Sequence, residues 1–166
     1  MISVLELFFL LRLARIFPFH LALALPLAVY YVLTRGSAYI PIAVSNVFLL
    51  QSWIPVPNYY FSLNVPTWSL SVELFFYAVF PLLSQMRTLR LIQLSVTLLA
   101  LNVFTFACLM QSQQDRWVIE GVLQLSHWLS YVNPLYRLFE FVAGILIFRL
   151  GTHQHDTRHE LTAILS

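Results

Sequence analysis

The stretch PTWSLSVELFFYAVFPLL, residues 66–83, decides the fold class of this chain. Beyond its first turn it is almost wholly apolar, and a helix of this length rises far enough to cross most of a bilayer core of roughly 30 Å. Ser69, Glu73 and Tyr77 recur at four-residue intervals, so they would face one side of such a helix. A carboxylate inside an apolar run is costly in a bilayer and marks a candidate site.

The composition of the whole chain agrees with a membrane setting. It is 60% hydrophobic and only 10% charged, whereas a soluble domain is about a quarter charged. The mean hydropathy of +0.78 implies more apolar surface than one small core could hide, so the lipid bilayer is the predicted partner. The net charge of +2 is spread thinly and forms no basic stripe, which argues against nucleic acid as a partner.

Four apolar stretches are long enough to cross the bilayer as helices. They are residues 16–34, 69–85, 89–110 and 135–150. A shorter apolar run, 39–54, carries Asn46, Gln51 and Ser52, and residues 1–11 form a brief apolar lead-in that could be the end of another helix. The predicted fold is therefore all-α, a polytopic transmembrane helix bundle of about four spans plus one re-entrant or interfacial helix at 39–54.

Arginine positions predict the topology, because short cytoplasmic loops collect Lys and Arg. Five arginines near the span ends are assigned to the cytoplasm: Arg12, Arg15, Arg87, Arg90 and Arg149. This assignment requires that 39–54 does not cross fully, since a full crossing would put Arg87 and Arg90 outside. Residues 55–67 are rich in proline and asparagine and are predicted to form an ordered loop leading into a helix that starts near Trp68.

Two further segments are more polar than the rest. Residues 111–134 are predicted to form an outer loop with a surface helix. Residues 151–166, GTHQHDTRHELTAILS, are predicted to be a polar tail in the cytoplasm. The expected domain division is therefore a membrane domain at 1–150 and a C-terminal tail at 151–166.

Glu73 also has a purely structural interpretation as part of a helix cap. Ser69 or Thr67 would accept a backbone N–H, and Glu73 would lie near the positive end of the helix dipole. The usual capping box places the acid three residues after the cap, however, whereas Glu73 follows Ser69 by four. From the residues alone both interpretations remain open.

The same stretch resembles the Trp-Ser-Leu-Ser-x-Glu-x-x-Phe-Tyr signature of the acyltransferase family 3 membrane proteins. Upstream, FFLLRLARIFPFHLALAL resembles the basic Arg-x-x-Arg element of that family, carried here by Arg12 and Arg15. Downstream, RLFEFVAGILI resembles its Arg-x-x-Glu-Phe-x-x-Gly helix, carried by Arg137 and Glu140. The three elements occur in the family's order and cover most of residues 7–150.

The resemblance implies transfer of an acyl group, typically acetyl, from cytoplasmic acyl-CoA to a hydroxyl of a sugar or cell-surface glycan. It implies residence in a bacterial inner (plasma) membrane, and a complete fold of roughly ten helices, of which this chain supplies about half. The family's base is thought to be a histidine on a first helix that is missing here, so this partial enzyme is predicted to be inactive alone. Acyl-CoA is the expected donor substrate, with no bound cofactor and no metal.

The site residues follow from these motifs. The catalytic candidates are Glu73 and Ser69. The substrate-binding candidates are Trp68, Ser71, Arg12, Arg15, Arg137 and Glu140. Arg12 and Arg15 are either anchors at the cytoplasmic rim or ligands of the acyl-CoA phosphates, while a structural ion pair is favoured for Arg137 and Glu140 because they are three residues apart.

The histidines are weaker candidates. His127 follows Arg116 with ten residues between them, a spacing that echoes the family's but is interpreted as coincidence in a polar outer loop. His20 is expected to be satisfied by a helix neighbour rather than to touch substrate. His153, His155 and His159 have ligand spacing, yet they lie in the tail, and no metal site is predicted there.

Two other classes of protein remain as alternatives. The first is a non-enzymatic membrane protein, such as a transporter fragment, with Glu73 and Arg137 lining a polar pathway. The second is a purely structural or non-functional truncation product. An internal pseudo-symmetric repeat would favour the transporter, and the sequence contains none that we detect.

Overall fold

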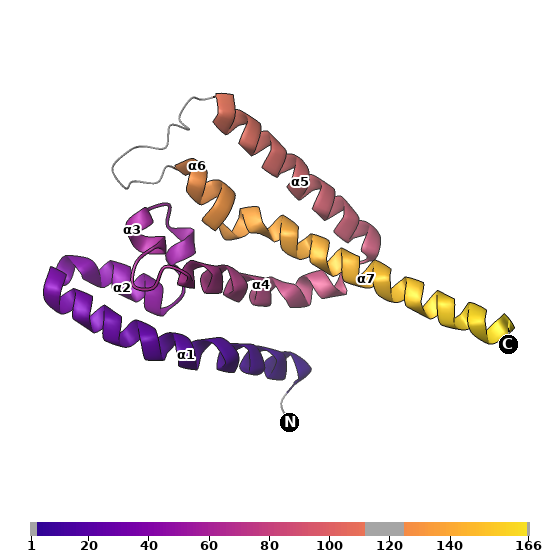
Figure 1. Cartoon of the computed structure of the whole chain (residues 1–166), viewed down its shortest axis with the longest axis horizontal. Helices are drawn as coiled ribbons and strands as arrows, with labels where there is room; N and C mark the ends of the chain where they lie inside the picture. The colour runs from indigo at the N-terminus through magenta and orange to yellow at the C-terminus, as the bar shows by residue number, and fades with distance from the viewer. Residues whose placement is uncertain (1–2, 112–124, 166) are drawn as a thin grey trace.

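The computed structural model describes residues 3–111 and 125–165, and within these ranges the chain is helical without any strand. Four long helices dominate, and short helical turns fill the connection between the first two of them (Figure 1). In order the elements are α1 Val4–Arg35, η1 Ser37–Tyr39, α2 Ile40–Val47, η2 Gln51–Trp53, α3 Pro57–Tyr60, α4 Thr67–Gln85, α5 Thr88–Gln111, α6 Leu125–His127, η3 Trp128–Val132 and α7 Pro134–Leu165. The predicted all-α class is confirmed.

Three helices in the described part of the chain are long and apolar enough to cross a membrane. They are Val4–Arg35, Thr67–Gln85 and Thr88–Cys108. They contain the predicted spans 16–34, 69–85 and 89–110, although the third qualifies only as far as Cys108. The predicted fourth span, 135–150, lies in α7 but is not among the three, and it carries Arg137, Glu140 and Arg149. The count of about four spans therefore includes one helix that is markedly more polar than the others.

Helix α1 is longer than the sequence suggests. It begins at a capping box in which the Ser3 hydroxyl accepts from the Glu6 amide at 3.2 Å and the Glu6 carboxylate accepts from the Ser3 amide at 2.7 Å. It then continues past Pro18 and Pro26 to Gly36, where the positive φ of 82° ends it. The idea that residues 1–11 end a separate helix is therefore wrong, because residues 4–11 belong to α1.

Residues 39–54 form a folded-back segment and not a span. Helix α2 has eight residues, which rise only about 12 Å and cannot cross a core of roughly 30 Å. It packs back on α1 through Ala28, Tyr39 and Ala43. The loop that follows residue 54 contains the short helix α3, and α4 begins at Thr67. The predictions of a re-entrant or interfacial segment and of a helix start near Trp68 agree with this structure.

Helices α4, α5 and α7 pack on one another around a small apolar core formed by Leu83, Leu91, Val142 and Leu146. The Arg149 guanidinium donates to the carbonyl oxygen of Met86 at 2.6 Å and also to that of Ser84, and so ties α7 to the end of α4. The backbone of α7 continues through the predicted domain boundary at 150/151 without a break (Figure 1). The predicted surface helix within 111–134 falls largely on residues 112–124, which lie outside the described part.

Candidate functional site

The signature stretch forms the first turns of α4, and its polar side chains do not cap that helix. Thr67 Oγ1 donates to the carbonyl oxygen of Asn64 at 2.7 Å, and Ser69 Oγ donates to that of Pro66 at 2.8 Å. Among the described residues, no side chain accepts a backbone N–H at the helix start. The cap interpretation of Thr67 and Ser69 is therefore wrong, because both hydroxyls point their protons away from the helix amides.

Glu73 is instead engaged by the aromatic residue one turn further on. The Tyr77 hydroxyl donates to Glu73 Oε1, as the four-residue spacing predicts. The guanidinium carbon of Arg12, on α1, lies 4.9 Å from the centroid of the Tyr77 ring and 5.5 Å from that of Phe8. We call Arg12, Glu73 and Tyr77 the Glu73 cluster. It joins the Arg-x-x-Arg element of α1 to the signature of α4.

The packing of α1 on α4 places Arg12 beside the middle of α4. Phe8 stacks on Phe80 with ring centroids 5.5 Å apart, and the Arg12 contact with Tyr77 then falls beside the middle of Thr67–Gln85. Arg12 therefore lies alongside α4 rather than beyond its end. Arg15 is exposed and does not join the cluster. A charge at this depth is costly in a membrane, which is typical of a functional residue.

A second group of predicted residues meets at the start of α4. The ring centroids of Trp68 and Tyr131 lie 4.8 Å apart. The guanidinium carbon of Arg137 lies 4.9 Å from the Tyr131 centroid and 5.7 Å from the Trp68 centroid, while Nε donates to the Tyr131 carbonyl oxygen at 2.9 Å. We call Trp68, Tyr131 and Arg137 the Trp68 cluster. Residues 68 and 77 are nine positions apart on α4, so the two clusters are separated by about 13 Å along its axis.

The ion pair predicted between Arg137 and Glu140 is present. Arg137 Nη1 lies 2.8 Å from Glu140 Oε2 and 2.9 Å from Oε1. The two side chains differ in exposure, however, at 22% for Arg137 and 61% for Glu140. The exposed carboxylate therefore adds little to stability, whereas the arginine is held mainly by its two aromatic neighbours and the Tyr131 carbonyl.

We expect the substitution Glu140→Gln to lower the free energy of unfolding by less than about 1 kcal/mol, because exposed ion pairs contribute roughly that much at most. Trp68→Ala should cost more, since it removes the ring on which Arg137 rests. The free energy of unfolding is measured for both variants and the parent chain after solubilisation in detergent. A larger loss for Glu140→Gln than for Trp68→Ala would contradict this assignment.

His127 lies among aromatic rings rather than in an open polar loop. Its ring centroid is 5.2 Å from that of Tyr131, 5.8 Å from that of Phe61 and 6.4 Å from that of Tyr60. Burial in this setting lowers the pKa of the His127 imidazole below its usual value of 6.5. The neutral form is therefore favoured in the fold.

This lowered pKa predicts a pH dependence. Below its usual pKa of about 6.5, the imidazole is protonated more in the unfolded chain than in the folded one, so stability falls as the pH drops through that value. We expect the thermal unfolding midpoint to be lower at pH 5.5 than at pH 7.5. In the variant His127→Phe, which keeps a ring but has no group that titrates, this difference should be smaller. Equal falls for both chains would show that other groups cause the effect.

Sequence reasoning missed a buried polar group at the junction of α1, α2 and α4. His20 Nε2 lies 3.0 Å from the Asn46 carbonyl oxygen, so its hydrogen-bond partner is a residue of α2. The Asn46 amide nitrogen donates to the carbonyl oxygens of Ile42 and Tyr59, at 2.9 and 3.0 Å. The only signal in the sequence was the cluster of polar residues within an apolar run at 39–54.

Several atoms in this region have no hydrogen-bond partner among the described residues. They include Ser71 Oγ, His20 Nδ1 and Gln51 Oε1, all buried. A cavity of about 40 Å³ lies beside His20, Asn46 and Thr67, which is room for one water molecule. Ser71 is therefore placed inside the protein, in contrast to the exposed Ser69. The side chains of His153, His155 and His159 lie outside the described part.

The long apolar helices define an α-helical integral membrane protein. Residues 3–166 match the model of the acyltransferase family 3, described as an acyltransferase domain. Acyltransferase MdmB of Streptomyces mycarofaciens is 31% identical to this chain over 153 residues, which cover 84% of the chain and 39% of that relative. The chain therefore belongs to the acyltransferase family 3, and it spans about two fifths of the length of this relative. No solved structure matches it.

Proposed function

We propose that this chain forms part of a membrane enzyme that transfers an acyl group, typically acetyl, from acyl-CoA to a hydroxyl of a sugar or glycan. The single observation that carries the proposal is the Glu73 cluster, in which Tyr77 donates to Glu73 and Arg12 rests on the Tyr77 ring. Two family elements that are distant in the sequence meet there, at a depth where charged groups are costly.

The reaction needs a group that handles one proton. The acceptor hydroxyl attacks the thioester carbonyl, a C–O bond forms, the C–S bond breaks, and the hydroxyl proton must leave while the thiolate gains one. Glu73 is the carboxylate available to accept that proton or to orient a histidine that accepts it. The histidine that the family resemblance assigns as base has no match in this sequence, and we therefore propose that this chain does not transfer the acyl group by itself.

The remaining predicted residues take supporting roles in this proposal. Arg12 and Arg15 are assigned to the phosphates of acyl-CoA, because guanidinium groups bind phosphate through several donors. Trp68, Ser71 and the Arg137–Glu140 pair are assigned to the acceptor side, with Ser69 as the exposed hydroxyl closest in sequence to Trp68. The setting is the lipid bilayer of a bacterial inner membrane, with the donor in the cytoplasm.

The test measures acyl transfer from radiolabelled acetyl-CoA to a glycan fraction in membranes. One preparation holds this chain alone, and the other holds this chain preceded by the segment that comes before the matching region of the Streptomyces relative. We expect transfer only with the extended chain. Transfer by the chain alone would contradict its dependence on a missing base, and no transfer by either to any tested glycan would count against the proposed activity.

A further inference from the structure

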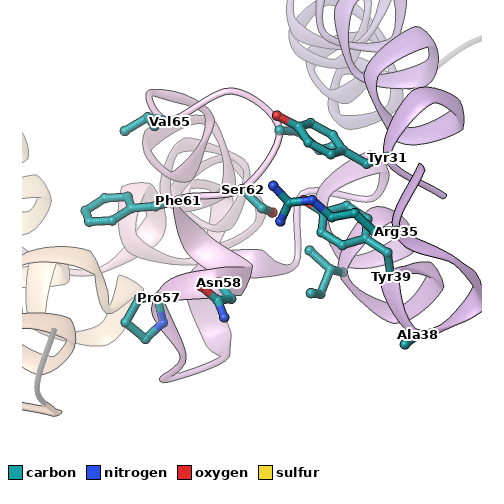
Figure 2. A pocket seen from close by; sticks show the side chains of 11 residues that line it. Tyr31, Arg35, Ala38, Tyr39, Pro57, Asn58, Phe61, Ser62 and Val65 are labelled. Carbon is teal, nitrogen blue, oxygen red and sulfur yellow. The ribbon is translucent and has the colours of Figure 1, made fainter. Parts of the chain in front are cut away.

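A cavity of about 580 Å³ lies where α1 ends, between that end and the loop that carries α3. Tyr31, Arg35 and Tyr39 line one side of it, and Asn58, Phe61 and Ser62 line the other. Figure 2 shows the Arg35 side chain directed from the α1 side toward Ser62. The volume of the cavity falls within the range of roughly 300–1,000 Å³ that is typical of small-molecule sites.

Arg35 gives this cavity a positive charge that no acidic side chain of the described residues pairs with. Its guanidinium carbon lies 4.9 Å from the Tyr31 centroid and 5.6 Å from the Tyr39 centroid, so two aromatic rings fix its position. None of the described residues that line the cavity is acidic, and within the same part of the chain Arg35 has no ion-pair partner. A fixed guanidinium without a carboxylate partner is suited to an anionic group of a ligand.

Other residues with hydrogen-bond donors line the same cavity. The hydroxyl groups of Tyr31 and Tyr39 have no hydrogen-bond partner in the described part of the chain, and Asn58 is exposed. The Ser62 hydroxyl is already used, because it donates to the Tyr59 carbonyl at 2.9 Å and accepts from Asn46. The donors without a partner among the described residues are thus a guanidinium, two phenols and an amide, and the apolar ring of Phe61 lines the same cavity. This combination suits a hydroxylated ring that carries a phosphate.

The cavity is connected to the Trp68 cluster by aromatic contacts. Phe61, a wall of the cavity, lies 5.8 Å from the His127 ring, and His127 lies 5.2 Å from Tyr131. Tyr131 in turn contacts Trp68. The opposite side of the α1–α2 contact is different, since it is an apolar groove lined by residues such as Val29, Val32, Leu33, Val44 and Val47. Only the side that faces the loop offers polar groups.

We propose that this cavity binds a phosphorylated sugar, with Arg35 and the two tyrosines on the phosphate and Phe61 against the ring. That this ligand is a remote part of the acyl acceptor rests on the proposed function, whereas the binding itself does not. Contacts to a non-reacting part of a substrate supply binding energy that helps to position its reactive hydroxyl.

The test measures binding by calorimetry to the purified chain in nanodiscs, with glucose 1-phosphate, glucose and inorganic phosphate as separate probes. We expect glucose 1-phosphate to bind at least about tenfold more tightly than either of the other two, since it alone engages both the guanidinium and the ring. Arg35→Gln should weaken its binding about tenfold or more. The matched control is Arg90→Gln, an exposed arginine on α5, which should leave binding unchanged.

Three results would overturn this inference: equal binding of glucose and glucose 1-phosphate, equal binding of inorganic phosphate and glucose 1-phosphate, or unchanged binding in Arg35→Gln. Asn58→Ala changes an exposed residue of the cavity, so it tests the site with little risk to folding and should weaken binding about threefold. The measurement uses no acyl-CoA, so a failure of acyl transfer and a failure of sugar phosphate binding are separate outcomes.

Discussion

Replacing Glu73 with glutamine is expected to lower the rate of acyl transfer by about 10²–10⁴-fold in the extended chain that contains the upstream segment. Glutamine has nearly the same shape, but it cannot accept a proton or carry the negative charge. The Tyr77 hydroxyl can still donate to the amide oxygen, so the local packing should persist. The rate is measured with saturating acetyl-CoA and glycan acceptor in membranes that contain matched amounts of protein.

Glu6→Gln is the matched control, because Glu6 is exposed at the start of α1 and glutamine can still complete the capping box. It should leave the rate within about twofold. Tyr77→Phe removes the hydroxyl that holds Glu73 and should reduce the rate less than Glu73→Gln does. Because both changes act through one carboxylate, the double variant should be no slower than Glu73→Gln alone. An unchanged rate in Glu73→Gln would remove Glu73 from the site.

Much of the fold could be predicted because membrane helices depend on the length and composition of apolar runs. The spans 16–34 and 69–85 lie in α1 and α4 for that reason. The predicted first span begins at residue 16, after Arg12 and Arg15, whereas α1 begins at Val4. Inside a packed bundle these residues are tolerated, because Arg12 rests on aromatic rings and the first turns of α1 are fixed by their own capping box.

The candidate site was predictable only where the contacts are local. Glu73 with Tyr77, and Arg137 with Glu140, are pairs within one turn, so helical spacing alone predicted each of them. The contact of Arg12 with Tyr77 depends on the position of α1 along the axis of α4. Packing contacts between the two helices, such as Phe8 against Phe80, determine that position. No local pattern in one sequence determines such a register, so the depth of Arg12 could be learned only from the structure.

The second large effect is expected from Asn46→Ala, which should lower the free energy of unfolding by about 2–3 kcal/mol. Asn46 is 1% exposed, and its amide nitrogen donates to Ile42 and Tyr59 carbonyl oxygens and, at 2.6 Å, to Ser62 Oγ. It therefore joins α2 to the loop that leads into α4. Alanine would leave these acceptors without that donor in a region where water is scarce.

The comparison uses unfolding of the detergent-solubilised chain by sodium dodecyl sulfate, followed by circular dichroism. Asn58→Ala is the matched control, because the same change at an exposed position of α3 removes no hydrogen bond to the described residues and should stay within about 0.5 kcal/mol of the parent. Asn46→Asp keeps the size but loses the donor, and should be at least as harmful as alanine. If Asn46→Ala were as stable as Asn58→Ala, the α2 segment would be held by its apolar contacts with Ala28 and Tyr39 alone. If Asn46→Ala lowers the free energy of unfolding by the expected amount, the hydrogen bonds of Asn46 are what keep residues 39–54 folded back on α1.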